Sequence, residues 1–282
     1  PKAGQNPQDI DVIGFHGQTL HHDPAHGFTW QIGNGSMLAR LTGINVVNDM
    51  RAADVAAGGQ GAPLLPLYHQ ARSGEMDGPV AILNIGGVSN VTYIGTDGEI
   101  LAFDTGPGNA LLDDWVKQHI NRSYDENGLL ARQGKIDEAV LHNCLKHPYF
   151  AQKPPKSLDR DAWDKSLYGN LAAADGAATL SAFTIHAIAK ALDHLPKPPA
   201  AWYVTGGGRH NPVLMEGLRQ IFNVQVKPVD DLGWNGDSLE AEGFAYLAVR
   251  SLQGLPLSLP TTTGVSRPVT GGVHYEWQNN IG

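Results

Sequence analysis

The sequence predicts an α/β protein with more than one domain, and three observations support this. The chain has 282 residues, which exceeds the roughly 150 that one domain commonly holds. Glycine follows short apolar runs at many places, where it lets the backbone turn at the end of a strand. From Val80 onward, the hydrophobic pattern predicts three strands and then helices that alternate with strands. In α/β proteins such strand ends commonly converge on one cleft.

The part of the chain before residue 77 predicts a mixture of strands and helices. We expect strands at 11–15, 28–32 and 44–47, and helices at 36–41 and 64–72. The run Ile44–Val47 is rich in β-branched residues, which favour strands. Pro63 stands where a helix can begin. Residues 49–61 are rich in Gly and Ala and predict a loop, and residues 73–79 have the composition of a linker.

The part from residue 77 onward has the clearer pattern. We expect strands at 80–85, 88–94, 100–103, 200–205 and 224–226, and helices at 109–120, 135–145, 175–192, 211–222 and 238–251. Short connections, one of them the Asp97-Gly98 turn, join the first three strands, so these strands are expected to be antiparallel. Residues 153–165 predict a polar loop, and the Pro, Thr and Gly content after residue 254 predicts a coil.

These elements divide the chain into a first domain at 1–76, a second domain at 77–253 and a C-terminal coil at 254–282. The first segment repeats the strand and helix alternation of the second, but without an opening of three strands. We therefore expect a duplicated domain whose first copy lacks its N-terminal strands.

Composition excludes several classes of protein. The hydrophobic fraction of 41% is too high for a mainly disordered chain. The net charge is −8, from 20 basic and 28 acidic residues, and no basic cluster suits a nucleic-acid backbone. No apolar run approaches the ~20 residues that span a bilayer. Cys144 is the only cysteine, so no intrachain disulfide forms, which is typical of a reducing compartment.

Two glycine turns are candidate ligand-binding loops. Asn84-Ile-Gly-Gly-Val-Ser-Asn90 joins two strands, and its free N–H groups could hold phosphate oxygens. An ordinary hairpin explains the same turn, although the two flanking amides are unusual there. Gly206-Gly-Gly208 lets a flat ligand approach the backbone between a strand and a helix, but this signal is weak by itself. Neither turn matches the dinucleotide or P-loop fingerprints.

Asp104 is the strongest candidate for a catalytic group. It follows a predicted strand and precedes the rigid turn Thr105-Gly-Pro-Gly108. A carboxylate held on stiff backbone at a cleft is suited to act as a general base. The alternative is that Asp104 caps the helix that begins near Asn109, but several residues separate the two.

The first domain contributes two polar motifs. His16, Gln18 and Thr19 follow a predicted strand and are suited to a sugar-like ligand, whereas His21, His22 and His26 suggest a metal only weakly because Asp23 alone lies nearby. The second motif holds Asn48, Asp49, Arg51 and Asp54. Arg51 between acidic residues is either part of a surface ion-pair network or a group that positions an anionic substrate.

Five strings in this order resemble the anhydro-N-acetylmuramic acid kinase family. They are GFHGQT, NDMRAADVAAGGQGAP, LNIGGVSNVT, AFDTGPGN and VTGGGRHNP. The resemblance extends from about Asp11 to Leu252. It implies a two-domain, actin-like ATPase (ribonuclease H-like) fold, in which each domain repeats three strands, helix, strand, helix, strand, helix.

The resemblance also implies an activity and its cofactors. Members of the family are carbohydrate kinases that use ATP and Mg²⁺, with an alcohol group as the phosphoryl acceptor. They open the 1,6-anhydro ring of anhydro-N-acetylmuramic acid and phosphorylate its 6-oxygen. The product, N-acetylmuramic acid 6-phosphate, belongs to peptidoglycan recycling in the bacterial cytoplasm. The expected partners are the small amino sugar and, at most, a second copy of the chain, with neither nucleic acid nor a membrane.

The resemblance assigns residues to three roles and none to a metal. Asp104 is expected to be the base that activates water. Asn84, Gly86 and Gly87 match the family's second phosphate loop, and Gly206, Gly207 and Gly208 match its adenosine loop. The sugar side is expected to include His16, Gln18, Thr19, Asn48, Asp49, Arg51, Thr105, Gly106 and Asn109. The family's first phosphate loop, which belongs to the missing opening strands, has no counterpart in the sequence.

Two other functions stay open on sequence grounds. One is a non-catalytic actin-like protein that binds a sugar and lacks the first phosphate loop. The other is a glycoside hydrolase that uses Asp104 without a nucleotide. A hydrolase needs a second carboxylate at a suitable distance, for which Asp49 and Asp54 are the candidates.

Overall fold

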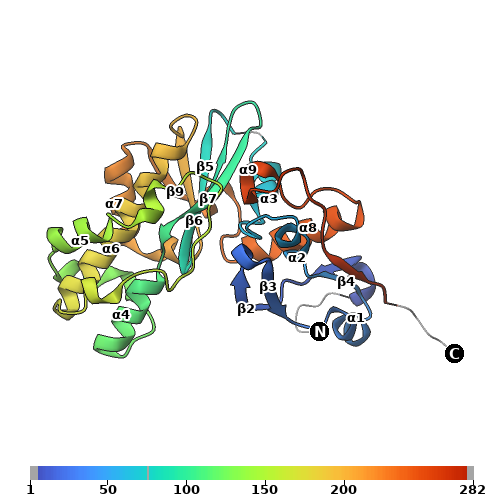
Figure 1. The fold of residues 1–282 in the computed structure, drawn as a ribbon, viewed down its shortest axis with the longest axis horizontal. Coiled ribbons are helices and arrows are strands. Elements are labelled where there is room, and N and C mark those ends of the chain that lie inside the picture. The colour runs from blue at the N-terminus through green and yellow to red at the C-terminus, as the bar shows by residue number, and fades with distance from the viewer. Residues whose placement is uncertain (1–5, 75, 278–282) are drawn as a thin grey trace. The chain divides into compact units, whose positions relative to one another are not determined.

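A computed structural model describes residues 6–74 and 76–277 as two compact units (Figure 1). The first unit combines residues up to Gly74 with residues from Ser238 onward, and the second unit ends at Asp237. This grouping differs from the predicted division after residues 76 and 253. The last long helix belongs to the first unit because it packs against the strands there. In the part of the chain that the structure describes, no helix has the length and apolar character to cross a membrane.

The second unit is built on one five-stranded sheet. Its strands are β5 (Val80–Ile85), β6 (Val88–Ile94), β7 (Ile100–Pro107), β8 (Ala201–Thr205) and β9 (Gln225–Pro228), in the order β7-β6-β5-β8-β9. β6 is antiparallel to both of its neighbours, whereas β8 is parallel to β5 and β9 to β8. The α/β class and the opening antiparallel meander are therefore confirmed. Along the chain, three strands are followed by helices that alternate with strands, as the resemblance implies.

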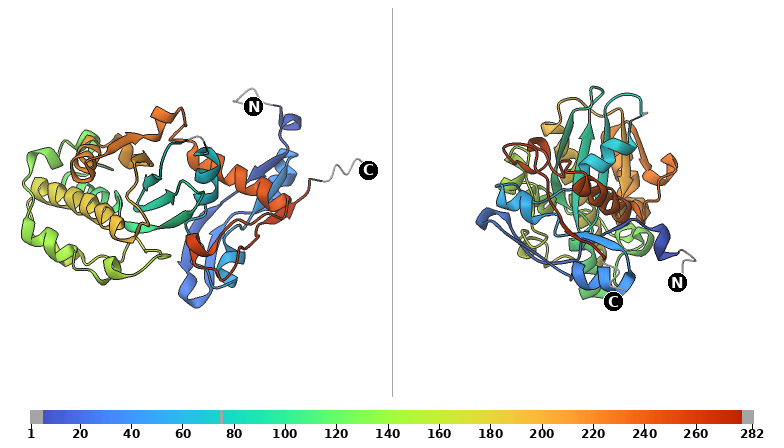
Figure 2. Two further views of the ribbon diagram at one scale, coloured as in Figure 1. Left: turned by 90° about the horizontal axis from the view of Figure 1, so that it is seen from above. Right: turned by 90° about the vertical axis from the view of Figure 1, so that its right-hand side faces the viewer.

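Helices complete the second unit. They are α4 (Ala110–Ile120), α5 (Glu138–Cys144), α6 (Ala173–Ala189) and α7 (Pro212–Phe222). α6 contacts α4, α5, α7 and β7, so it lies at the centre of the helical layer (Figures 1 and 2). This position explains why almost every residue from Gly176 to Ile188 is buried, since a central helix is apolar all round. Against the sheet, the Trp202 and Phe222 rings stack with centroids 4.1 Å apart.

The first unit contains a three-stranded sheet and a separate hairpin. β1 (Val12–Gly14) pairs in parallel with β4 (Asn45–Asn48), and β10 (Val273–Tyr275) pairs antiparallel with β4. β2 (Gln18–Asp23) and β3 (Phe28–Ile32) form the hairpin. The helices are α1 (Gly35–Thr42), α2 (Ala52–Ala56), α3 (Pro66–Arg72), α8 (Leu239–Leu252) and α9 (Pro260–Thr263). α8 packs on β1 and β4, where Phe244, Leu247 and Ala248 bury Val47.

Three sequence expectations were wrong in the first unit. Residues 18–23 were not among the expected strands, yet they form β2 because their backbone pairs with β3 while most of their polar side chains stay exposed. The predicted loop at 49–61 contains α2, which four alanines between residues 52 and 57 favour. The predicted coil after residue 254 contains α9 and β10, because β4 offers β10 a free edge.

Candidate active site

One edge of the five-stranded sheet gathers the sequence motifs of the second unit. Because β6 alone runs antiparallel, β5, β7, β8 and β9 all end at this edge. Asn84 lies in register with Thr205, so the two predicted ligand loops start side by side. The edge where parallel strands end is where open α/β sheets bind ligands.

Backbone hydrogen bonds lock the loop after β5 to the loop after β7. The N–H of Asn109 donates to Gly86 O at 2.7 Å, and Ala110 N–H donates to Gly87 O at 3.1 Å. The Asn109 side chain donates from Nδ2 to Ile85 O at 3.0 Å. A Cβ at Gly108 would lie 2.2 Å from Gly86 O, so this approach requires glycine.

The glycine loop after β8 lies close to the end of β5. Gly206 has φ +76°, and a Cβ there would lie 2.4 Å from Asn84 Oδ1 and 2.7 Å from Ile85 O. The structure therefore brings together Asn84, Gly86, Gly87, Gly206, Gly207, Gly208 and Asn109 at one edge of the sheet.

Asp104 lies inside β7 and not after it, because the strand continues to Pro107 instead of ending at Phe103. Asn90 pairs with Asp104 and Ser89 with Gly106, which leaves Thr105 as the extra residue of a β-bulge. Bulges bend a strand and re-aim its side chains, and they are common beside active sites. Ser89 Oγ fixes the bulge through Thr105 Oγ1 at 2.7 Å and Gly106 O at 3.2 Å.

The Asp104 carboxylate is held in a buried position, with only 8% of the residue exposed. Its Oδ2 accepts the N–H of Leu158 at 2.8 Å. The N-cap position of α4 is occupied by Asn109, so Asp104 is not its N-cap residue and that alternative is wrong. Leu158 belongs to the segment that the sequence predicted only as a polar loop.

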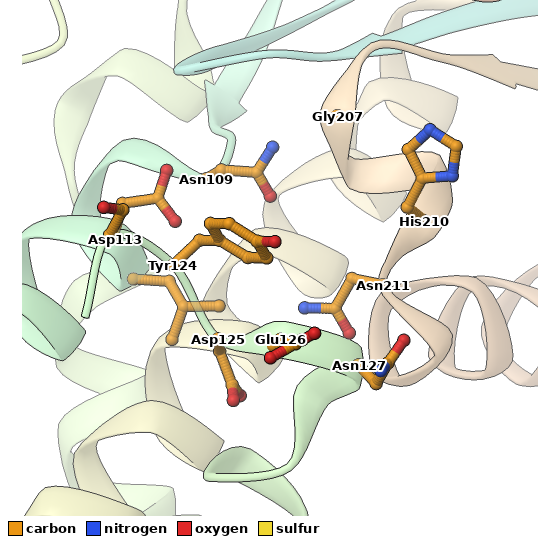
Figure 3. Close-up of a pocket in the computed structure, with 11 residues that line it drawn as sticks. Asn109, Asp113, Tyr124, Asp125, Glu126, Asn127, Gly207, His210 and Asn211 are labelled. Carbon is orange, nitrogen blue, oxygen red and sulfur yellow. The ribbon is translucent and has the colours of Figure 1, made fainter. Parts of the chain in front are cut away.

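A cavity of about 470 Å³ opens beside the glycine loop (Figure 3). It is lined by Asn109, Leu112, Asp113, Ser123, Tyr124, Asp125, Glu126, Asn127, Gly207, His210 and Asn211. Asn109 and Gly207 were predicted site residues. The others were missed, although the polar and aromatic run Ser123–Asn127 between two helices was a usable signal. Asp125 shapes the wall, because its carboxylate accepts the N–H groups of Leu130 and Ala131 at 2.8 and 3.0 Å.

Asp113, in the wall of this cavity, is expected to lower stability at neutral pH. Burial, and then the charge of Asp114, raise its pKa from 3.8 to about 6. The folded state thus binds this proton more tightly than the unfolded state, so stability falls as pH rises through that interval. We expect Asp113→Asn to unfold at a higher temperature than the parent protein near neutral pH. Thermal unfolding followed by circular dichroism should show this advantage disappearing below about pH 4; an advantage independent of pH would contradict it.

In the first unit, the parallel strands β1 and β4 also end at one edge, and this brings His16 to Arg51. Arg51 donates from Nε to His16 Nε2 at 2.9 Å and from Nη1 to Gly61 O at 2.6 Å. His16 therefore carries its proton on Nδ1, which donates to Gly17 O at 2.8 Å. Burial, and then the Arg51 charge, lower the pKa of His16 to about 4. His16 is neutral at physiological pH, and both of its nitrogens are occupied.

The remaining sugar-side candidates are spread over the first unit. Gln18 and Thr19 lie on β2 with exposed side chains, and Thr19 Oγ1 accepts from Gln31 Nε2 at 3.3 Å. Asn48 ends β4, and its Oδ1 is buried without a hydrogen-bond partner among the described residues. Asp49 follows with φ +53°, a left-handed conformation that re-directs the chain towards α2.

Two other candidates have structural roles. Asp54 is buried, and its carboxylate accepts Gly61 N–H at 2.6 Å and the Thr263 hydroxyl at 2.5 Å. These contacts make it unsuited to serve as the second carboxylate of a hydrolase. His22 is held between Thr29 Oγ1 and Gln60 O, each at 2.9 Å. Among residues 6–74 and 76–277, no group of three or more His, Cys, Asp or Glu side chains is placed to hold a metal.

Comparison with known proteins gives one consistent result. The family model for anhydro-N-acetylmuramic acid kinase matches residues 2–277. An anhydro-N-acetylmuramic acid kinase of Rhizorhabdus wittichii is 56% identical over 273 residues, which cover 96% of this chain and 74% of that protein. The chain belongs to this family. A family member of the same name from Methylobacterium nodulans is 54% identical over 272 residues, covering 96% of this chain and 73% of that protein.

Similar solved structures are more distant. An activator of 2-hydroxyisocaproyl-CoA dehydratase from Clostridium difficile, with bound ADPNP, gives a TM-score of 0.41 at 15% identity, over 67% of this chain and 69% of that chain. A xylulose kinase from Lactobacillus acidophilus gives a TM-score of 0.34 at 17% identity. The match covers 58% of this chain and 41% of that chain. Scores this low define no shared fold, so the assignment to the anhydro-N-acetylmuramic acid kinase family rests on the sequence matches.

Proposed function

We propose that this chain uses ATP to open the 1,6-anhydro ring of anhydro-N-acetylmuramic acid and to phosphorylate the released 6-oxygen, in the cytoplasm of a bacterium. The product is N-acetylmuramic acid 6-phosphate, an intermediate in recycling of the peptidoglycan cell wall. Family membership supports the substrate. The observation that carries the mechanism is the buried Asp104 carboxylate, fixed on a bulged strand beside two glycine loops. The relatives named above are kinases, so they lend no support to the non-catalytic alternative.

The second unit offers a nucleotide site of suitable chemistry. Gly206–Gly208 and the Asn84–Gly87 turn present backbone at the end of the parallel strands, where N–H groups can face phosphate oxygens. The adjoining cavity of about 470 Å³ has the size of a small-molecule pocket, and Tyr124 offers an aromatic face to a base. Mg²⁺ commonly binds through phosphate oxygens and water with one or two carboxylates.

Asp104 supplies the proton acceptor that ring opening requires. Water attacks the anomeric carbon, the bond from that carbon to the 6-oxygen breaks, and Asp104 takes the proton that water loses. The freed 6-oxygen takes the γ-phosphoryl group and ADP leaves. Phosphoryl transfer depends mainly on alignment and charge neutralisation, so a rigid carboxylate beside rigid loops suits the reaction. For the sugar we propose Thr105, Gly106 and Asn109 of the second unit. The first-unit residues His16, Gln18, Thr19, Asn48, Asp49 and Arg51 stay predictions from the family resemblance.

A coupled assay of ADP release tests this function. We expect ADP release to depend on added anhydro-N-acetylmuramic acid and to match the phosphorylated sugar formed. In ¹⁸O-labelled water, mass spectrometry should find one label in the sugar and none in the phosphoryl group. Ring opening without ATP would favour the hydrolase instead, and no sugar-dependent ADP release would refute the proposal.

A further inference from the structure

Residues 149–158, here called the strap, hold Asp104 through three hydrogen bonds. Tyr149 donates its hydroxyl proton to the backbone oxygen of Asp104 at 2.5 Å. The Asp104 N–H donates to Lys156 O at 3.0 Å. The Leu158 N–H donates to the carboxylate at 2.8 Å. The position of this carboxylate therefore depends on the position of the strap.

The Lys156 side chain anchors the strap from within. Only 6% of this residue is exposed. Its Nζ donates to Tyr149 O at 3.1 Å and lies 3.3 Å from His194 Nε2. The ammonium group lies 4.5 Å from the Tyr149 ring centroid and 5.7 Å from that of Phe103, the neighbour of Asp104 on β7. One side chain thus joins both ends of the strap to the strand that carries the proposed base.

We infer that Lys156 is a positioning residue that sets the orientation of Asp104 through the strap. This inference rests on the proposed role of Asp104 as the base. Lys156 reaches Asp104 through the backbone: its Nζ donates to Tyr149 O, and its own carbonyl oxygen accepts the Asp104 N–H.

The burial of a lysine at position 156 is not explained by a gain in folding stability. Burial lowers the pKa of Lys156 to about 8, which means that keeping its charge in the fold costs free energy at neutral pH. The proton is bound less tightly in the folded state, so stability rises as pH increases from about 8 towards the ordinary lysine value. Replacing a buried charge with an apolar side chain of similar volume is often neutral or stabilising. Lys156→Met should therefore fold and can be assayed.

The test measures kcat and KM of Lys156→Met in two backgrounds, the parent protein and Asp104→Asn. In the parent background we expect kcat to fall by about 10- to 100-fold, as a small misplacement of a reacting group does, with both KM values unchanged. In the Asp104→Asn background we expect no further fall, because the group that Lys156 positions is already disabled. Tyr149→Phe, which removes only the hydroxyl donor to Asp104 O, should show the same dependence on background. Lys153→Met, the same change at an exposed position of the strap, is the matched control and should leave kcat unchanged.

The outcomes separate the two proposals. If Asp104→Asn turns over normally, the proposed base is wrong and this inference falls with it. If Asp104→Asn is inactive but Lys156→Met keeps the parent kcat, only the positioning role is refuted. Equal losses from Lys156→Met in both backgrounds would likewise refute it, since they indicate a general structural effect. Binding of a fluorescent ATP analogue and thermal unfolding confirm that each variant is folded.

Discussion

Asp104→Asn is expected to lower kcat by about 10²–10⁴-fold, the usual loss when a general base is removed. Asparagine keeps the size of the side chain and an oxygen that accepts the Leu158 N–H, but it cannot take the proton from water. Ring opening and phosphoryl transfer should fall together because the freed 6-oxygen is the phosphoryl acceptor. Steady-state ADP release measures phosphoryl transfer, and mass spectrometry of the sugar measures ring opening.

The affinities for ATP and the sugar should stay near those of the parent protein. Asp161→Asn, the same change at an exposed side chain, serves as the control and should be neutral. Parent-like turnover by Asp104→Asn would remove this residue from the mechanism.

Gly206→Ala is expected to weaken nucleotide binding at least 10-fold and to lower the unfolding temperature. Two effects combine at this position. A side chain at φ +76° and ψ 177°, a backbone region that essentially only glycine occupies, costs about 1–3 kcal/mol. The added Cβ would also lie 2.4 Å from Asn84 Oδ1 and 2.7 Å from Ile85 O, so the two loops must separate. Isothermal titration with a non-hydrolysable ATP analogue measures the loss of affinity.

Gly233→Ala separates these effects. Gly233 also lies in the second unit, with φ +71°, but a Cβ there meets nothing within 4 Å. Because Gly233 has ψ 16°, an ordinary left-handed conformation, Gly233→Ala should show the cost of a positive φ without a clash, and it should bind the nucleotide as the parent does. If both variants bind equally, the close approach of the glycine loop to Asn84 is irrelevant to the nucleotide.

The sequence predicted the second unit far better than the first. The reason is that local sequence patterns specify the strands of the second unit, whereas some strands of the first form only by pairing with distant segments. β5 and β6 follow from local patterns, namely a buried apolar run and alternation around a short turn. β2 and β10 do not, because exposed polar residues form these strands only through pairing with partners at other positions in the chain. Likewise Asp104 could be chosen from its motif, whereas the bulge at Thr105 depends on its register with β6.

The chemistry around Asp104 was less predictable than Asp104 itself. Lys156 and Leu158 lie some fifty residues further along a segment without periodicity, and no local signal links such a segment to β7. The cavity beside Gly207 was missed for the same reason, because its walls come from three separate segments. Motifs mark residues that contact ligands directly, but they do not mark the residues that hold those groups in place.

The first unit is discontinuous in the chain, and this affects the order of folding during synthesis. Val47, Met50 and Leu64 leave the ribosome early, yet Phe244 and Leu247, which complete their core, are translated after the whole second unit. Bonds such as that from the Tyr68 hydroxyl to Glu242 close a loop of 174 residues. Contacts this distant in sequence slow folding. The second unit is continuous from residue 76 to Asp237 and can fold as soon as it emerges, while the amino-terminal strands lack part of their core until α8 is synthesised.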